Sequence, residues 1–321
     1  MWADVDQRTK ATGTALLDGF APHCGLRERD AGGPSDDPLF HPVPAIAKAD
    51  AALSNASISG ALGGDPAAIV PANGPAFAKL DALLGCDGSA CRRSSAEPTT
   101  LKTSPNTGLT SVGGAVNLAS TAVEDLILAY TDGKPMDGFG AATLDAGALL
   151  QLSALHTLKS DLTTQTPYTS RAQGSNLLAH VVATIDQAAS GSRNGKTRAP
   201  MSARFIAFVG HDTNLSALAG LLRLHWLMAG YQSDDTPPGG ALVFEVYAPA
   251  GTHEAFVRTY FYGAKPRRDA NAFERGAGPC TGVRSRLPGF RLPDRDVRSH
   301  HGRRDRSVVR RRLVTFAVAP L

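Results

Sequence analysis

Residues 204–247 read RFIAFVGHDTNLSALAGLLRLHWLMAGYQSDDTPPGGALVFEVY, and this stretch decides the predicted fold. It opens with a short apolar run, residues 205–209, in which β-branched and aromatic residues are prominent and which Gly210 closes. Such a run predicts a strand that is buried on both faces of a parallel sheet. Apolar residues then recur at helical spacing from Leu215 to Trp226. We therefore expect a strand, a turn and a helix, with the turn at the carboxyl end of the strand, where open α/β sheets bind ligands.

The predicted turn holds four polar residues, His211, Asp212, Thr213 and Asn214. Free N–H groups at the start of a helix favour an anion, and His211 adds a donor that can carry positive charge. Asp212 in the same place could hold a proton and give it to a leaving oxygen. The plain alternative is a helix cap, because Asp and Asn serve well in that position. The His-Asp pair alone does not choose between these interpretations.

The wider pattern is more specific, since residues 210–214 read GHDTN, residues 236–240 read TPPGG and residues 244–245 read FE. This order resembles the C-terminal motif region of the histidine acid phosphatases, in the bacterial branch of phytases and glucose-1-phosphatases of the histidine phosphatase superfamily. The resemblance covers about residues 2–262. It implies an α/β fold in which a parallel-type sheet of the phosphoglycerate-mutase kind is flanked by helices. A smaller helical domain is inserted, and substrate lies in the cleft between the two domains.

The N-terminal segment carries a second motif, in which residues 4–9 read DVDQRT. It can be a strand end followed by a capped surface helix with Arg8 in solvent. It also resembles the segment in which these phosphatases place a phosphate-binding arginine. On that resemblance Arg8 grips phosphate with its planar fork of donors, and Asp4 lies close to the substrate. The resemblance likewise implies catalytic roles for His211 and Asp212, and a substrate contact for Thr213.

Three amphipathic patterns predict helices in the middle of the chain, at about residues 115–130, 144–158 and 175–189. A mostly helical middle between two sheet-forming ends matches the layout that the resemblance implies. By position, Glu124, His156 and Arg171 line up with residues that face the cleft in the family. Each has a plain alternative: a solvated helix charge, a satisfied histidine on an apolar face, and an arginine of a surface loop.

The predicted organisation has four parts. Residues 1–48 and 171–262 form the α/β domain, residues 49–170 form the inserted helical domain, and residues 263–321 form a basic tail that we expect to be disordered. From residue 264 onward the chain holds 15 Lys and Arg against 5 Asp and Glu, so the rest holds 18 against 24. The tail resembles nothing in the family and has no amphipathic period. It is interpreted as a change of reading frame or as an arm that binds nucleic acid non-specifically; we expect no nucleic-acid partner, because the tail lacks a binding motif.

One family signature, Arg-His-Gly-x-Arg-x-Pro, does not occur in this sequence. In the family its histidine is the nucleophile, and the order HHGRR at residues 300–304 imitates it only superficially. The resemblance implies a two-step hydrolysis of a small phosphorylated substrate such as phytate or a sugar phosphate, through phosphohistidine and with no metal or cofactor. The expectation is that the chain is an incomplete enzyme, inactive alone. The alternative is a non-catalytic pseudoenzyme that binds phosphate esters.

Composition sets wider limits. The chain of 321 residues is 42% hydrophobic and 19% charged, which is ordinary for a globular protein. No apolar run approaches the roughly 18 residues of a membrane span. The residues after Met1 do not resemble a signal peptide, although the resemblance implies a periplasmic enzyme. The cysteines lack zinc-ligand spacing; Cys86 and Cys91 could close a small loop, or one of them could pair with a distant cysteine.

Overall fold

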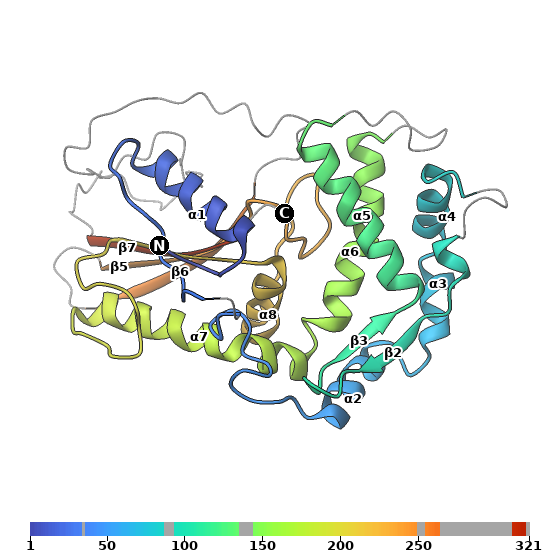
Figure 1. Cartoon of the computed structure of the whole chain (residues 1–321), viewed down its shortest axis with the longest axis horizontal. Helices are drawn as coiled ribbons and strands as arrows, with labels where there is room; N and C mark the ends of the chain where they lie inside the picture. Colours follow the sequence, from blue (N-terminus) through green and yellow to red (C-terminus); the bar gives the residue numbers. More distant parts are fainter. Residues whose placement is uncertain (34–35, 87–92, 135–143, 249–253, 264–309, 319–321) are drawn as a thin grey trace, which may run out of the picture.

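The computed structural model describes residues 1–33, 36–86, 93–134, 144–248, 254–263 and 310–318, the last of these by backbone alone. One mixed sheet and its covering helices form one end of the molecule, and a mainly helical part forms the other (Figure 1). The sheet order is β1-β4-β7-β5-β6, and a two-stranded sheet, β2-β3, belongs to the helical part. The predicted fold class, an α/β sheet flanked by helices with a helical insertion, is confirmed.

The large sheet is parallel on one side and antiparallel on the other. Strands β1, β4 and β7 run parallel, while β5 pairs antiparallel with both β7 and β6. The strands are β1 (Trp2–Ala3), β4 (Phe205–Gly210), β5 (Ala241–Ala248), β6 (Phe256–Tyr262) and β7 (Arg310–Val318). Strand β4 is the predicted apolar run at residues 205–209, and all of it after Phe205 is buried.

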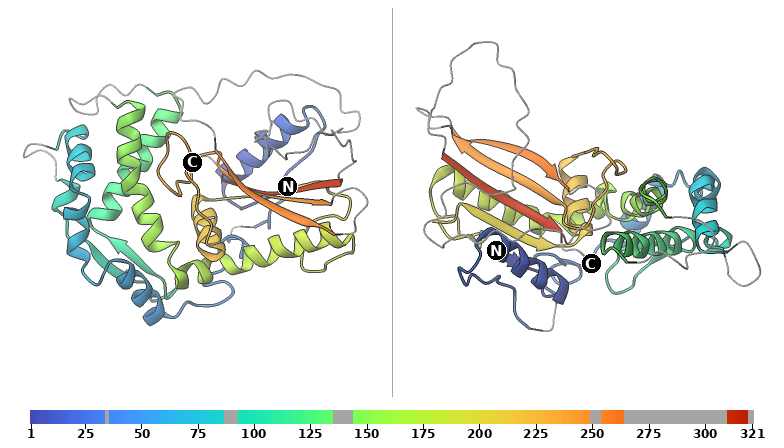
Figure 2. Two further views of the ribbon diagram at one scale, coloured as in Figure 1. Left: turned by 180° about the vertical axis from the view of Figure 1, so that it is seen from behind. Right: turned by 90° about the horizontal axis from the view of Figure 1, so that it is seen from above.

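Helices cover both faces of this sheet (Figure 2). Helices α7 (Pro167–Ser190) and α8 (Asp212–Leu222) pack on the face that carries Ile206 and Phe208, through one buried cluster. Helix α1 (Gln7–Phe20) covers the opposite face, where its Phe20 ring stacks on Phe205 with centroids 5.0 Å apart. Helices α7 and α8 approach closely at Gly174, where an added Cβ would lie 2.8 Å from Leu221 Cδ1.

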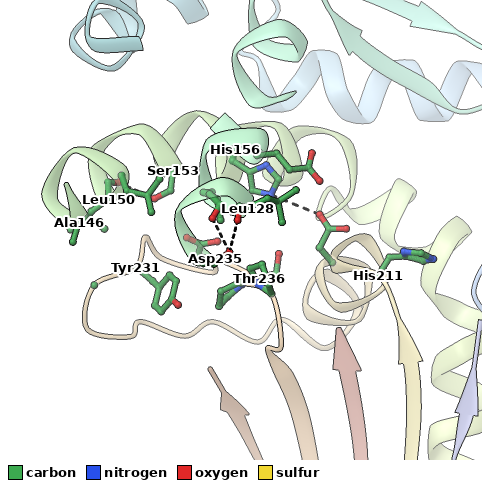
Figure 3. A pocket seen from close by; sticks show the side chains of 17 residues that line it. Leu128, Ala146, Leu150, Ser153, His156, His211, Tyr231, Asp235 and Thr236 are labelled. Carbon is green, nitrogen blue, oxygen red and sulfur yellow. Dashed lines mark hydrogen bonds and ion pairs between the residues drawn. The ribbon is translucent and has the colours of Figure 1, made fainter. Parts of the chain in front are cut away.

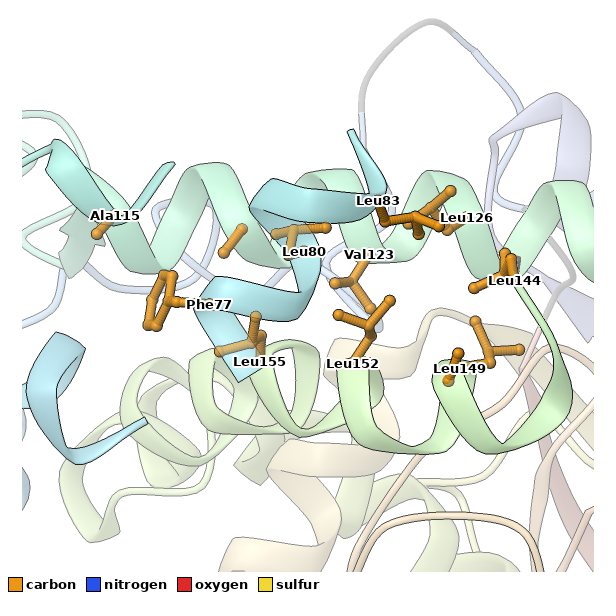
Figure 4. Packing of buried hydrophobic residues seen from close by; sticks show 12 residues of the cluster. Phe77, Leu80, Leu83, Ala115, Val123, Leu126, Leu144, Leu149, Leu152 and Leu155 are labelled. Atoms are coloured by element: carbon orange, nitrogen blue, oxygen red, sulfur yellow. The ribbon is translucent and has the colours of Figure 1, made fainter. Parts of the chain in front are cut away.

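The helical part is built around the antiparallel contact of two long helices (Figure 4). Helices α5 (Ala115–Thr131) and α6 (Ala146–Thr163) correspond to the first two predicted helices, and α4 (Gly74–Leu83) packs on them. This part also contains α2 (Ala51–Ala61), α3 (Ile69–Ala72), β2 (Thr100–Thr103) and β3 (Thr110–Gly113), with short 3-10 helices at Pro66–Ala68 and Ser94–Ala96. Apolar residues at helical spacing therefore identified the principal helices of this part.

The third predicted helix differs in its start. Helix α7 begins at Pro167 rather than at residue 175, and so it runs across the predicted boundary at residue 170. Proline fits the first helical position, since its missing N–H has no partner there anyway. Ser175, at the predicted start, lies within a helix that packs on the sheet through Leu177 and Val181.

The C-terminal tail contains the main surprise of the fold. We expected residues 263–321 to be disordered throughout, but Arg310–Val318 forms β7, which lies between β4 and β5. Its registers pair Val314 with Ile206 of β4 and with Phe244 of β5. The sequence LVTFAV at 313–318 has the β-branched and aromatic composition of a strand, and the arginines before it obscured this pattern. The rest of the expected tail, 264–309 and 319–321, lies outside the described residues.

Proline in place of Val314 is expected to destabilise the protein strongly. Strand β7 is central, so the lost N–H leaves a buried acceptor on a neighbouring strand without a donor, at about 1–3 kcal/mol. The matched control is Val257→Pro on the edge strand β6, where Val257 is 47% exposed. Denaturant unfolding should show the larger loss for Val314→Pro; equal losses would contradict the central position of β7.

Two further features concern disulfide bonds and membrane-spanning helices. Cys24 and Cys86 are both disulfide-bonded. Among the residues that the structure describes, no helix is both long and apolar enough to cross a membrane.

Candidate functional site

Strand pairing brings two segments about 200 residues apart to one edge of the sheet. Strand β1 pairs in parallel with β4, with Ala3 opposite Val209, and Asp4 donates its backbone N–H to Val209 O at 2.9 Å. The residues that follow the two strands therefore emerge side by side. These are Asp4 and the first turn of α1 from one segment, and His211 and the first turn of α8 from the other.

The imidazole of His211 contacts three side chains of the N-terminal segment. Its Nδ1 lies 3.0 Å from a guanidinium nitrogen of Arg8, and its Nε2 lies 2.9 Å from Asp4 Oδ2 and 3.1 Å from Asp6 Oδ2. Arginine can only donate, so Nδ1 accepts and the proton of the ring sits on Nε2. The imidazole is then neutral, its Nε2–H directed at the carboxylates. Arg8 is exposed beside it, with its positive charge available to an anion.

Asp4 is the buried residue that both histidines of the cluster contact. It is fully buried, and His41 Nε2 lies 2.6 Å from the same Oδ2 that His211 contacts. Burial alone would raise the pKa of Asp4, but hydrogen bonds from His211, His41 and the Val5 N–H outweigh it and hold the pKa well below its usual range. The hydrogen bond to Asp4 in turn raises the pKa of His41, against the effect of burial. Asp4 is thus a carboxylate, and it orients both imidazoles.

The start of helix α8 is fixed by a side chain that sequence analysis left without a role. Asn214 Oδ1 accepts the backbone N–H of His211 at 2.9 Å, and Asn214 Nδ2 donates to Phe40 O at 2.8 Å. This second bond ties the segment that carries His41 to α8. The capping alternative therefore holds for His211 as the N-cap residue of α8 and for Asn214 as its capping-box partner, while Nε2 of His211 and the carboxyl group of Asp212 contact other groups.

Sequence reasoning missed two members of the cluster, Asp6 and His41. Asp6 belongs to the quoted motif DVDQRT, and its place two residues after Asp4 was the available signal. His41 comes from a Gly- and Pro-rich segment with no periodicity, and only its tertiary contact with Asp4 shows its place.

The cluster includes the described groups that could hold a metal ion. One ligand atom each from Asp4, Asp6, His41 and His211 lies within 4.8 Å of the others. Two imidazoles and two carboxylates are a ligand set that zinc accepts. The guanidinium of Arg8, 3.0 Å from His211, opposes a cation and favours an anion at this edge. The charge arrangement therefore supports anion binding better than metal binding.

A pocket opens next to this cluster and extends into the helical part (Figure 3). His211 and Asp212 border it on the side of the sheet, and Glu124 of α5 and His156 of α6 border it on the other side. His156 Nε2 lies 3.8 Å from Asp212 Oδ2, and His156 Nδ1 lies 3.3 Å from the hydroxyl oxygen of Ser120. Asp212 therefore stands between the Arg8–His211 cluster and the pocket.

The other two predicted residues lie differently. Thr213 is exposed in the first turn of α8, directly after Asp212. Arg171 is exposed on α7 and is not among the residues that line the pocket. The structure thus gathers Asp4, Arg8 and His211 in one cluster and Asp212, Glu124 and His156 around one pocket, and it leaves Arg171 outside both.

Known proteins share this arrangement of strands and motifs. The family model of the histidine phosphatase superfamily (branch 2) matches residues 1–262. The chain belongs to this superfamily. A phytase from Escherichia coli (strain K12) is 35% identical over 256 residues, which cover 76% of the chain and 58% of that phytase. A glucose-1-phosphatase from Providencia rettgeri is 28% identical over 163 residues, 50% of the chain and 37% of that protein.

Solved structures of the family give the same result. The chain superposes on the phytase of Citrobacter braakii with a TM-score of 0.70 and 30% identity, covering 81% of the chain and 66% of that structure. For the phytase of Hafnia alvei in complex with myo-inositol hexakis sulphate, the TM-score is 0.62 and the identity 29%, over 78% of the chain and 66% of that structure. The chain spans little more than half of the phytase that it matches in sequence.

Replacing Asp4 with Asn is expected to cost about 1.5–3 kcal/mol of unfolding free energy at pH 6, because two imidazoles lose a hydrogen bond to a buried carboxylate. The folded pKa of Asp4 lies below its unfolded value, so its contribution is present above about pH 4 and is lost as pH falls through the folded pKa. The acid limb of the stability curve should therefore flatten in Asp4→Asn. Asp18→Asn, on the exposed side of α1, is the control; a similar change in both variants would contradict the role of Asp4.

Proposed function

We propose that this chain carries half of the phosphoryl-transfer site of a bacterial phosphomonoester hydrolase that works through a phosphohistidine. One observation carries the proposal: Arg8 and His211, 203 residues apart, contact each other at 3.0 Å beside the pocket that Asp212 borders. A cation, an imidazole and a carboxyl group at the carboxyl end of parallel strands are the groups that an anionic ester needs.

Each group takes one role in the proposal. Arg8 binds two non-bridging oxygens of the phosphoryl group with its planar fork. His211, held by Asp4 through Nε2 and by Arg8 through Nδ1, stabilises the charge of the equatorial oxygens when the phosphate replaces one of these contacts. Asp212, between this cluster and the pocket, gives a proton to the oxygen of the departing alcohol. Thr213, Glu124 and His156 are proposed substrate contacts of the same site.

The nucleophile completes the reaction in two steps. A histidine attacks phosphorus, the alcohol leaves with the proton of Asp212, and water then hydrolyses the phosphohistidine. The Arg-His-Gly-x-Arg-x-Pro signature does not occur in the 321 residues, and we propose that the chain alone is inactive for this reason. The same observation supports the alternative function, a binder of phosphate esters that does no chemistry. The disulfides at Cys24 and Cys86 support a periplasmic location, since disulfides persist in that compartment.

Binding of radiolabelled orthophosphate to the full chain, measured by equilibrium dialysis, tests the half-site. Arg8→Ala is expected to weaken binding about 10–100-fold, because it removes a charged donor worth about 1.5–3 kcal/mol. Arg171→Ala removes an equal charge from the exposed surface of α7 and should leave the affinity unchanged. Equal losses in both variants would show that only net charge matters, and this would overturn the proposed site.

A further inference from the structure

The pocket beside Asp212 is rich in acidic side chains. It is bordered by three carboxyl groups, those of Glu124, Asp212 and Asp235, and by two imidazoles, those of His156 and His211. Among the described residues that line it, none is Lys or Arg. The side where a departing alcohol would sit is therefore acidic, whereas the positive charge of Arg8 lies on the other side of His211.

The acidic groups act on one another across the pocket. Asp235 is 3% exposed, and its pKa is raised to about 6: burial and the charge of Asp212 raise it, and His156 and two backbone N–H groups oppose them. Burial likewise raises the pKa of Glu124; His156 opposes this and Asp212 adds to it. Two imidazoles thus border a pocket with three carboxyl groups, and the charge of Asp212 acts on both of the others.

The remaining wall is neutral. Side chains of Leu128 and Leu150, from α5 and α6, and Pro237, from the loop before β5, provide apolar surface. Ser153 and Tyr231 line the same space with hydroxyl groups (Figure 3). Burial raises the pKa of Tyr231 to about 12, so its hydroxyl stays protonated. Such a wall suits an uncharged ring, which can lie on the apolar surface and exchange hydrogen bonds with hydroxyls and carboxylates.

We propose that the site selects phosphomonoesters whose leaving group is an uncharged ring, hydroxylated or aromatic, and discriminates against polyphosphorylated alcohols. The inference rests on the proposed function, because it uses Asp212 as the border between phosphate and leaving group. A second phosphate on the leaving group would enter a partly dehydrated space opposite Glu124 and Asp235, where like charges repel far more than in water. Rejection by unfavourable charge is a common source of specificity. Three of the four relatives described above are phytases, so this inference separates the chain from them.

Competition for the orthophosphate site, measured at a pH well above the pKa of about 6 of Asp235 so that its carboxyl group is ionised, tests the inference with the full chain. Displacement of radiolabelled orthophosphate by glucose 1-phosphate is compared with its displacement by inositol hexakisphosphate. Only the bound label that the unmodified chain retains and the Arg8→Ala variant does not is counted. This counting excludes polyanion bound at residues 264–321, with their 15 Lys and Arg. Glucose 1-phosphate is expected to bind at least about tenfold more tightly than the hexakisphosphate. Equal affinities, or a preference for the hexakisphosphate, would overturn the inference. If orthophosphate still binds in that case, the proposed function stands. If orthophosphate does not bind at all, the proposed function and the inference that rests on it both fail.

Replacing a pocket carboxylate with its neutral amide tests whether its charge causes the discrimination against the hexakisphosphate. Glu124→Gln, and separately Asp235→Asn, should each lower the preference for glucose 1-phosphate over the hexakisphosphate by about 3–10-fold, since each removes one repelling charge. Asp125→Asn removes an exposed carboxylate next to Glu124 on the same helix and is the matched control. A preference that is unchanged in Glu124→Gln, or lowered equally in Asp125→Asn, would contradict the role of the pocket carboxylates.

Discussion

Fused behind a segment that carries the Arg-His-Gly-x-Arg-x-Pro signature, the chain is expected to hydrolyse an aryl phosphate, whereas the 321 residues alone should stay at background. The gain should be about 10³-fold or more, because a covalent mechanism without its nucleophile keeps only binding and electrostatic stabilisation. Arg8, His211 and Asp212 already lie close together at one edge of the sheet. The assay is release of phenol or of orthophosphate at pH 4 to 5.

Two controls separate this gain from a general effect on folding. The same fusion with alanine in place of the signature histidine should be as inactive as the chain alone. The active fusion should lose most of its rate in His211→Ala, which removes the imidazole that Arg8 and Asp4 hold. Turnover by the unfused chain that disappears in His211→Ala would contradict the expectation and would point to a nucleophile within these 321 residues.

The second large effect concerns Asp212 in the active fusion. If Asp212 protonates the leaving oxygen, Asp212→Asn should lose about 10²–10⁴-fold in kcat on a sugar phosphate, because general acid catalysis typically contributes that much. On an aryl phosphate with an acidic phenol the leaving group departs without a proton, so the loss should be much smaller. The ratio of the two losses is the quantity to measure.

Other roles for Asp212 give other ratios. Were Asp212 only a cap of α8, Asn would replace it well and both substrates would be hydrolysed at nearly full rate. Large and equal losses on both substrates would indicate a damaged phosphate site. Either outcome would remove Asp212 from the role of general acid, whereas a loss confined to the sugar phosphate supports it.

The fold could be predicted from sequence where local pattern and tertiary role agree. Strand β4 is a dense apolar run because both faces of the sheet bury it, and helices α5 and α6 show the 3.6-residue period because one face of each is packed. Strand β7 was not predicted, since its paired residues in β4 and β5 are 62 or more residues away (Ala248 pairs with Arg310) and its own start is a run of arginines. Pairing between strands that are far apart in the sequence leaves no pattern in the local sequence from which the partner could be predicted.

The site residues divide in the same way, into those that local sequence patterns predict and those that only tertiary contacts reveal. The motifs with Arg8 and with His211 and Asp212 were visible because each sits directly after a strand or at a helix start. His41 and Asp235 were not, because each lies in an irregular segment and acquires its importance from Asp4 or from the pocket. Arg171 was expected at the cleft by position, but the early start of α7 places it on an exposed turn of that helix.

The most direct test of the half-site is the ¹⁵N NMR spectrum of the His211 imidazole in the full chain, with and without orthophosphate. The structure predicts a neutral ring protonated on Nε2 in the free chain, with Nδ1 accepting from Arg8. Orthophosphate should shift these resonances in a saturable way, and Arg8→Ala should abolish the shift at the same concentration. Resonances that do not respond to orthophosphate, or that respond equally in Arg8→Ala, would contradict the claim that Arg8 and His211 form a phosphate site.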